Sequence, residues 1–273
     1  MADISNRLAW LDNARLVAML LMISGHICGY LVDGVAAGAG LFQTFIVAFN
    51  MPMFVILSGY GNCGSLERMS SFAEFGKSLW RSFTRVLLPV LPPMLLFCLI
   101  ERSWDALGFE TVLWFLWMLF YLMVISAISF GGVTLCFSLL GRFIKIEEEI
   151  LKEARLWFSL FMMIGLAMIL DRQYTCEFCT YFAVGILARH YKIFDIDALK
   201  QWWMIALIAI VSVGLYAYWF DMQSGHWFYW NNLRQMKAAG LLPHYVLRQI
   251  IATGVTIALI LTIIRLSKTY KRL

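Results

Sequence analysis

The sequence predicts an all-α protein that crosses a membrane several times, and three observations lead to this fold class. Hydrophobic residues make up 62% of the 273 residues and charged residues only 14%, whereas a soluble domain is about a quarter charged. The apolar residues form runs approaching the roughly 20 residues that a helix needs to cross a bilayer. Eleven tryptophans suit a chain with many membrane interfaces. We expect one integral-membrane domain over residues 1–273.

Eight apolar segments are the predicted transmembrane helices. They lie at residues 13–31, 41–62, 86–100, 111–130, 156–170, 176–190, 201–220 and 245–264. Three are short, so we expect a helical bundle of about eight spans, within a range of seven to nine. Residues 131–141 either lengthen the fourth span or form a re-entrant segment. Residues 145–155 are expected to form a charged connecting helix.

The distribution of Lys and Arg predicts that both termini are cytoplasmic. If the N-terminus is inside, only five of the 22 basic residues fall on the outer side. Cytoplasmic loops of membrane proteins carry such an excess of positive charge. The same bias accounts for the net charge of +5, and no basic block is long enough to predict nucleic-acid binding.

The six cysteines predict neither a disulfide framework nor a metal site. Four lie in or beside apolar segments, where cysteine packs as a small hydrophobic residue. Cys176 and Cys179 form one C-x-x-C pair without a second pair of ligands, so zinc is not expected. A local disulfide and simple packing remain the two alternatives for this pair.

The first candidate site lies in "RLVAMLLMISGH", where Arg15 and His26 are eleven residues apart. On a helix this spacing is about 16 Å and about three turns, so the two residues share a face. Arg15 is expected near the cytoplasmic interface and His26 deep in the bilayer, where ionisable groups usually face the bundle interior or a wet cavity. Removal from water favours a neutral imidazole, the form that a general base requires. The alternative is a histidine that hydrogen-bonds across helices for packing.

The second span contains "FNMPMFVILSGYGNCG", in which Pro52 is predicted to break or kink the helix. Asn50 beside it is a candidate contact to a substrate. Ser58, Gly59 and Gly61 are small residues that allow helices to approach closely.

Arg81 and Arg85 in "RSFTRVLLPVLPP" form a second candidate site, at the cytoplasmic start of the third span. Four residues apart on a helix, they share one face. The positive-inside rule alone predicts basic residues here. Two guanidinium groups on one face also suit a phosphate-bearing ligand.

Together these stretches resemble the membrane-bound acyltransferase family 3, and among its members the fucose 4-O-acetylases most. The similar segments are "LDNARLVAMLLMISGH", "FNMPMFVILSGY", "RSFTRVLLP", "LWFLWMLF" and "YFAVGIL", in this order from about residue 7 to residue 190. The resemblance implies transfer of an acyl group, commonly acetyl from acetyl-CoA, to a hydroxyl of a sugar or cell-envelope glycan, free or lipid-linked. It also implies a bacterial plasma membrane protein among membrane lipids.

The resemblance also implies roles for individual residues. His26 matches the catalytic histidine and Arg15 its motif partner. Arg81 and Arg85 match the arginines that hold the phosphates of coenzyme A, and Asp12 matches the acidic residue that opens the first motif, on the substrate side. In the implied reaction, neutral His26 removes the proton of the acceptor hydroxyl as it attacks the thioester. A covalent acyl-histidine intermediate is the rival mechanism.

The chain departs from the family pattern in two respects. Many relatives carry a histidine where this chain has Asn50, and an amide can orient a hydroxyl but cannot shuttle its proton. The family also has more spans than the eight predicted here, so we expect the C-terminal part to be shortened. An inactive acyltransferase-like protein is therefore one alternative, and a transporter or flippase for lipid-linked sugars is another, although no inverted repeat is evident.

Overall fold

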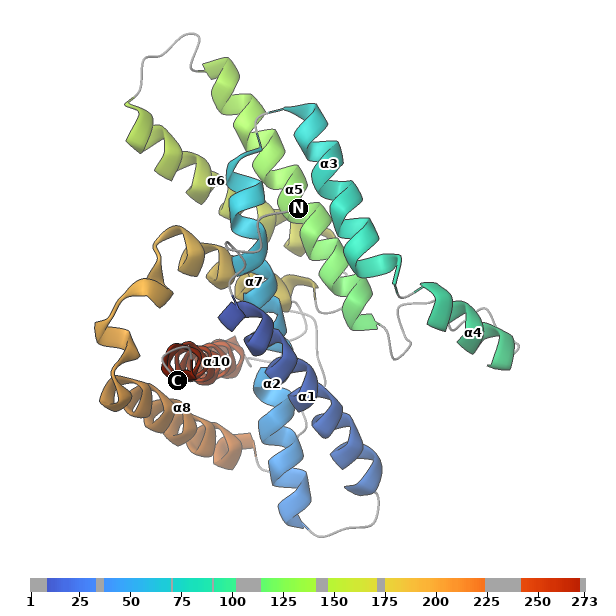
Figure 1. The fold of residues 1–273 in the computed structure, drawn as a ribbon, viewed down its shortest axis with the longest axis vertical. Helices are drawn as coiled ribbons and strands as arrows, with labels where there is room; N and C mark the ends of the chain where they lie inside the picture. Colours follow the sequence, from blue (N-terminus) through green and yellow to red (C-terminus); the bar gives the residue numbers. More distant parts are fainter. Residues whose placement is uncertain are drawn as a thin grey trace. The chain divides into compact units, whose positions relative to one another are not determined.

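The computed structural model describes residues 9–32, 37–69, 71–89, 91–101, 114–140, 147–170, 175–223 and 242–270. Within these residues all regular structure is helical, which confirms the predicted all-α class (Figure 1). The α-helices are α1 (Ala9–Val32), α2 (Ala37–Glu67), α3 (Phe72–Ser82), α4 (Leu91–Glu101), α5 (Trp114–Leu140), α6 (Glu148–Leu170), α7 (Thr175–His190), α8 (Trp202–Gln223) and α10 (Leu242–Tyr270). A π-helix, η2 (Phe83–Leu87), follows α3, and two short 3-10 helices, η4 (Ile193–Asp195) and η5 (Ala198–Lys200), join α7 to α8.

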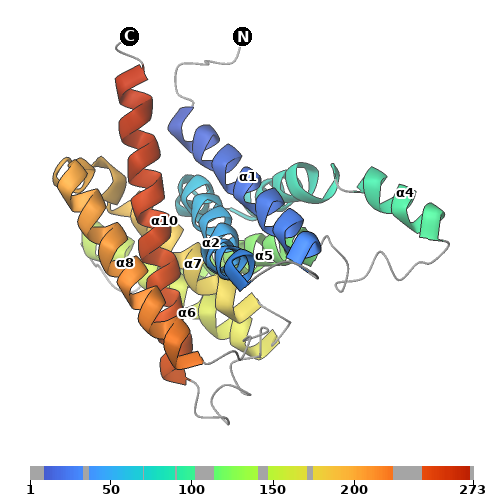
Figure 2. The same cartoon turned by 90° about the horizontal axis from the view of Figure 1, so that it is seen from below.

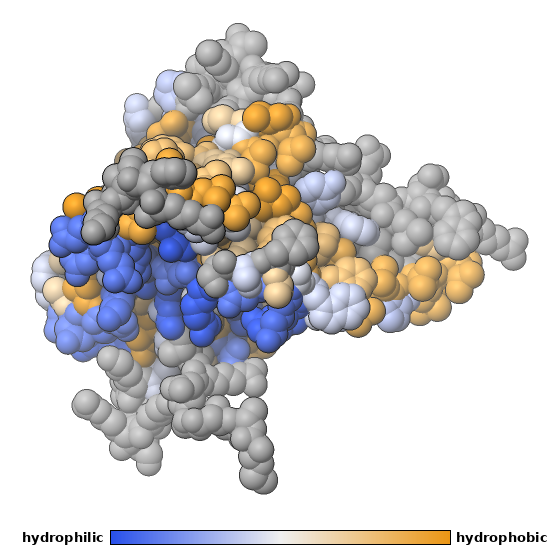
Figure 3. Space-filling view, turned by 90° about the horizontal axis from the view of Figure 1, so that it is seen from above, coloured by the Kyte–Doolittle hydropathy of each residue, from blue (hydrophilic) through white to orange (hydrophobic). Residues whose placement is uncertain are grey.

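Three helices of the described part are long and apolar enough to cross a membrane. These stretches are Phe115–Leu140, Glu148–Leu170 and Tyr245–Ser267, and Trp202–Tyr218 is a shorter apolar helix. Large apolar side chains lie on their surfaces; Ile169, for example, is 76% exposed. Figure 3 shows broad hydrophobic areas on the face it presents. Such surfaces suit contact with lipid. The number of spans and the cytoplasmic termini stay predictions.

The helix boundaries refine several of the predicted segments. α5 continues to Leu140, so residues 131–140 lengthen the fourth span and are not re-entrant. The charged segment and the fifth span form one helix, α6, because no proline or glycine separates them. The predicted third span, 86–100, is divided between η2 and α4.

The chain folds into two compact units, Met1–Gly61 with Tyr181–Leu273, and Asn62–Thr180. α2 and α7 contribute residues to both units. In the first unit, α8 packs against α10 (Figure 2). Phe49, Tyr216, Ile251 and Val255 form a buried apolar cluster between α2, α8 and α10. Asn13 of α1 donates to the Ser267 hydroxyl of α10 (3.4 Å), so the N-terminal end of α1 lies beside the C-terminal end of α10 (Figure 2).

The second unit is built around α5, which packs against α6 and against α3 with η2 (Figure 1). Arg155 of α6 donates to the Thr134 hydroxyl of α5 at 2.9 Å. A half-open apolar hollow of about 280 Å³ lies between α5 and the segment leading into α3. Its wall includes Gly131 and Gly132 of α5, which have no side chains that could fill the hollow.

Candidate functional site

The two residues of the first candidate site lie on one uninterrupted helix. α1 runs from Ala9 to Val32, so Arg15 and His26 are separated by about three helical turns, or about 16 Å. The side chain of His26 lies outside the described residues, and its direction stays a prediction. Arg15 is partly exposed, and its Nη1 lies 3.9 Å from Oδ1 of Asp12, one turn earlier. α1 therefore brings Asp12 and Arg15 together at its N-terminal end.

The guanidinium of Arg15 lies against Gly61 of α2. A Cβ atom on Gly61 would stand only 2.7 Å from Nη2 of Arg15, which is closer than non-bonded atoms approach. The guanidinium therefore occupies the space that a side chain at position 61 would take. The sequence indicated Gly61 only as a small packing residue, and this partnership became visible only in the structure.

The side chain of Asn50 forms a hydrogen bond with the backbone next to the proline of α2. Its side chain is buried, with 3% of the residue exposed, and its Oδ1 accepts the N–H of Met51 at 2.6 Å. Pro52 lies inside α2, which continues to Glu67, so of the two predicted outcomes, a break or a kink, the helix does not break. Asn50 supplies a local acceptor where the helical hydrogen bonding is disturbed by the proline. A substrate contact of Asn50 stays a prediction.

The C-terminal end of α7 adds a guanidinium that the sequence analysis counted only as a cytoplasmic charge. Nη1 of Arg189 donates to the phenolic oxygen of Tyr60 (3.1 Å), and its Cζ lies 5.1 Å from the centre of the Tyr60 ring. Trp10 and Phe194 pack against the same ring at 5.2 and 5.4 Å. A signal existed in the sequence, since Arg189 follows the family-like "YFAVGIL", but nothing in it connected α7 with Tyr60.

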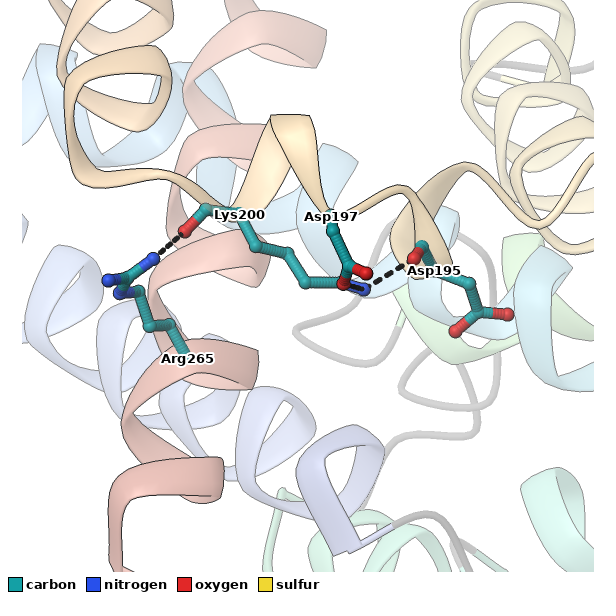
Figure 4. Close-up of polar contacts among 4 residues, drawn as sticks. All are labelled: Asp195, Asp197, Lys200 and Arg265. Carbon is teal, nitrogen blue, oxygen red and sulfur yellow. Dashed lines mark hydrogen bonds and ion pairs between the residues drawn. The ribbon is translucent and has the colours of Figure 1, made fainter.

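A separate polar network ties η5 to α10 (Figure 4). Nζ of the buried Lys200 donates to the carbonyl of Asp195 and to Oδ1 of Asp197 (2.9 Å). The carbonyl of Lys200 accepts from Arg265, whose guanidinium lies 5.0 Å above the Trp202 ring. Lys200 is paired with the carboxylate of Asp197, and Arg265 binds a backbone carbonyl, so the network joins helices and has the character of a structural connection.

Arg81 and Arg85 belong to the second unit, at the junction of α3 and η2. Both are exposed. Leu88 donates to the carbonyl of Phe83 (2.9 Å), a bond across five residues, and the Thr84 hydroxyl donates to the carbonyls of Trp80 (2.9 Å) and Arg81 (3.2 Å). A π-helix turns less per residue than the roughly 100° of an α-helix. Residues four apart therefore come close to alignment, and Arg81 and Arg85 leave the helix on the same side.

Among the residues that the structure describes, no group of three or more His, Cys, Asp and Glu side chains could hold a metal ion. Cys176 and Cys179 are not joined by a disulfide. Of the two alternatives for this pair, the structure therefore shows packing.

The comparison with protein families decides the class of this chain. The model of the Acyltransferase domain of acyltransferase family 3 matches residues 8–273. This chain belongs to acyltransferase family 3. The family supports acyltransferase activity, and the family together with the apolar helices indicates an integral membrane protein. No curated protein and no solved structure matches the chain.

Proposed function

We propose that the protein is a membrane-embedded O-acyltransferase that moves an acyl group, acetyl in the first instance, from acyl-CoA to a hydroxyl of a sugar or cell-envelope glycan. The observation that carries the proposal is the continuity of α1. In this unbroken helix the backbone positions of Arg15 and His26 lie about three turns, or about 16 Å, apart, a spacing that favours one shared face. Acyl-CoA carries phosphates at one end and a thioester at the other. This arrangement matches the separation between Arg15, which would lie near the phosphates, and His26, which would act at the thioester.

The donor end of the proposal rests on the positive groups. Arg81 and Arg85 are exposed on one side of the α3–η2 segment, and guanidinium groups bind phosphate oxygens through paired hydrogen bonds. Coenzyme A carries several phosphate charges and is made in the cytoplasm, the side on which the charge bias places these arginines. Metal chemistry is not needed for acyl transfer from a thioester.

The reaction needs one proton acceptor and one leaving group. The oxygen of the acceptor hydroxyl attacks the thioester carbonyl carbon while the neutral imidazole of His26 takes the hydroxyl proton. The carbon–sulfur bond then breaks, and the coenzyme A sulfur leaves and receives the proton from the imidazolium. The products are the O-acyl ester and coenzyme A, and the histidine returns to its neutral form.

Replacement of the proposed base tests the function. We expect His26→Ala to lower the transfer of labelled acetyl from acetyl-CoA by roughly 100-fold or more, the contribution typical of a general base. The variant should still accumulate in membranes and bind coenzyme A. His244→Ala, which removes an imidazole from α10, serves as the matched control and should keep wild-type activity.

Three results of this assay separate the candidate functions. Wild-type activity in His26→Ala would contradict the assigned base. Binding of coenzyme A by the wild type without turnover, over a panel of sugar acceptors, would indicate an inactive member of the family. No binding of coenzyme A at all would remove the proposed donor and leave transport of lipid-linked sugars as the remaining hypothesis.

A further inference from the structure

Two guanidinium groups from different helices meet the same turn of α2 in the first unit. Arg15 of α1 lies against Gly61, and Arg189 of α7 lies over Tyr60, the preceding residue. Residues 60 and 189 are 129 positions apart, so only the fold brings Arg189 to this turn of α2. We infer that Arg189 binds a phosphate group of the acyl donor beside Arg15. The inference rests on the proposed function and adds a binding residue to it.

The position of Arg189 is defined by contacts that leave its group in reach of solvent. Tyr60 is 4% exposed and is fixed by the rings of Trp10 and Phe194. Arg189 itself is exposed, although its guanidinium stacks on the Tyr60 ring and donates to the phenolic oxygen. A guanidinium has five N–H donors, so a contact with tyrosine is compatible with a fork of two bonds to phosphate. Such a preformed group binds an anion with little loss of side-chain entropy.

Acidic and basic side chains both lie beside this pair of arginines. Oδ1 of Asp12 lies 3.9 Å from Nη1 of Arg15. Arg189 is followed by His190 in the last turn of α7. Basic side chains attract and orient phosphate-bearing ligands.

The position of Arg15 on α1 connects the proposed phosphate site with the proposed catalytic histidine. Arg15 lies on the helix that carries His26, about 16 Å away. A phosphate held between Arg15 and Arg189 would therefore lie at a suitable distance from His26 for the proposed reaction. All three residues belong to the first unit.

Arg265 provides a matched control for Arg189. Its guanidinium lies over an aromatic ring at nearly the same distance, 5.0 Å against 5.1 Å. Its hydrogen bond, however, goes to the carbonyl of Lys200, within the network that joins η5 to α10. Loss of Arg265 should therefore weaken the fold without removing a ligand contact.

The test uses the full chain purified in detergent, with coenzyme A and adenosine 3′,5′-bisphosphate as probes in isothermal titration calorimetry. We expect Arg189→Gln to weaken binding of both probes by roughly tenfold or more, the loss of a charge-assisted contact. Arg189→Lys keeps the positive charge but cannot form two parallel hydrogen bonds to phosphate, so its affinity for both probes should fall several-fold. In the transfer assay the KM for acetyl-CoA should rise in parallel while kcat stays within about twofold. Arg265→Gln should lower the melting temperature and leave both affinities unchanged.

Wild-type affinity in Arg189→Gln would overturn the inference and leave the proposed function intact. If that variant does not fold, wild-type affinity in Arg189→Lys overturns it equally. An equal loss of affinity in Arg265→Gln would also overturn it, because the effect would then be structural. If the wild-type protein binds neither probe, the proposed donor is wrong and this inference falls with it.

Discussion

Gly61 shows how a single missing side chain can place a functional one. The residue is exposed, so burial does not require a glycine there, and helices disfavour glycine by roughly 1 kcal/mol relative to alanine. Its place in α2 is explained by the guanidinium of Arg15, which fills the space beside it. Gly64, one turn later, has only ordinary contacts, with Nη2 of Arg68 at 3.8 Å from a Cβ placed there.

The comparison of these two glycines yields a prediction. Gly61→Ala should displace the flexible end of Arg15 and lower acyl transfer by roughly tenfold, because an interaction with the donor of about 1.4 kcal/mol is lost. Its thermal stability should stay the same or rise, since alanine favours the helix. Gly64→Ala should gain similar stability and keep its activity. Melting curves and acetyl transfer in the same detergent measure both properties, and equal activity of the two variants would contradict the assigned role of Gly61.

Asn50 shows that a polar residue inside a membrane helix can be explained by its own backbone. Its Oδ1 accepts from Met51, directly before Pro52. A buried N–H without a partner would be unfavourable by about 1–3 kcal/mol. The hydrogen bond to the Met51 N–H is sufficient to explain a polar side chain at this position. The expected contact with a substrate would be a second role.

Among the helices, α2 and α7 approach each other closely in the first unit. A Cβ atom on Gly59 would overlap the carbonyl of Phe182, and one on Gly185 would overlap the carbonyl of Ile56. Small residues at helix interfaces in membranes allow such contact of backbones. The crossing also helps to place the Arg189–Tyr60 pair, because Tyr60 directly follows Gly59 and Arg189 lies about one turn beyond Gly185.

This crossing should be sensitive to added volume. Gly59→Ala or Gly185→Ala forces backbone atoms apart and should lower the free energy of unfolding by about 1–3 kcal/mol, seen as a lower melting temperature in detergent. Gly214→Ala in α8, where a new Cβ meets no atom within 4 Å, is the control and should be neutral or stabilising. A melting temperature for Gly185→Ala at or above that of the wild type would show that the helices separate without loss.

The segment from α3 to η2 is the other element with functional consequences. The Thr84 hydroxyl satisfies carbonyls at the start of the π-helix, where the ordinary hydrogen-bond pattern is interrupted. π-Helical turns occur often at functional sites. Here the turn aligns Arg81 with Arg85, so the irregular backbone serves the proposed phosphate contact.

For the whole molecule, orientation in the membrane is the property from which the sidedness of the reaction follows. Only five of the 22 basic residues lie on the predicted outer side. The positive-inside rule then places Arg15, Arg81 and Arg189 at the cytoplasm, where acyl-CoA is available.

Reporter fusions test this orientation. Green fluorescent protein fused after Leu273 should fluoresce, and alkaline phosphatase at the same place should be inactive, because the former folds in the cytoplasm and the latter in an oxidising compartment. Fusions after Gln235, in a predicted outer loop, should behave in the opposite way. An active phosphatase after Leu273 would reverse the orientation and remove cytoplasmic acyl-CoA as the donor at these arginines.

Composition and residue spacing were sufficient to predict the helical class, the apolar character of the helices and the separation of Arg15 and His26 along one helix. These properties are local: composition decides which solvent a helix tolerates, and the helical repeat decides which residues share its face. The family motifs could likewise be recognised along the chain, and the family match over residues 8–273 confirmed the resemblance.

The tertiary structure decided which side chains meet. The contacts of Arg15 with Gly61 and of Arg189 with Tyr60 join residues far apart in the sequence, and no periodicity within one helix specifies its neighbour. The continuity of α2 through Pro52 is accompanied by a hydrogen bond of Asn50, and the π-helix at Arg85 by hydrogen bonds of Thr84. Such contacts arise from packing between helices and from local backbone geometry, and therefore only the folded chain reveals them.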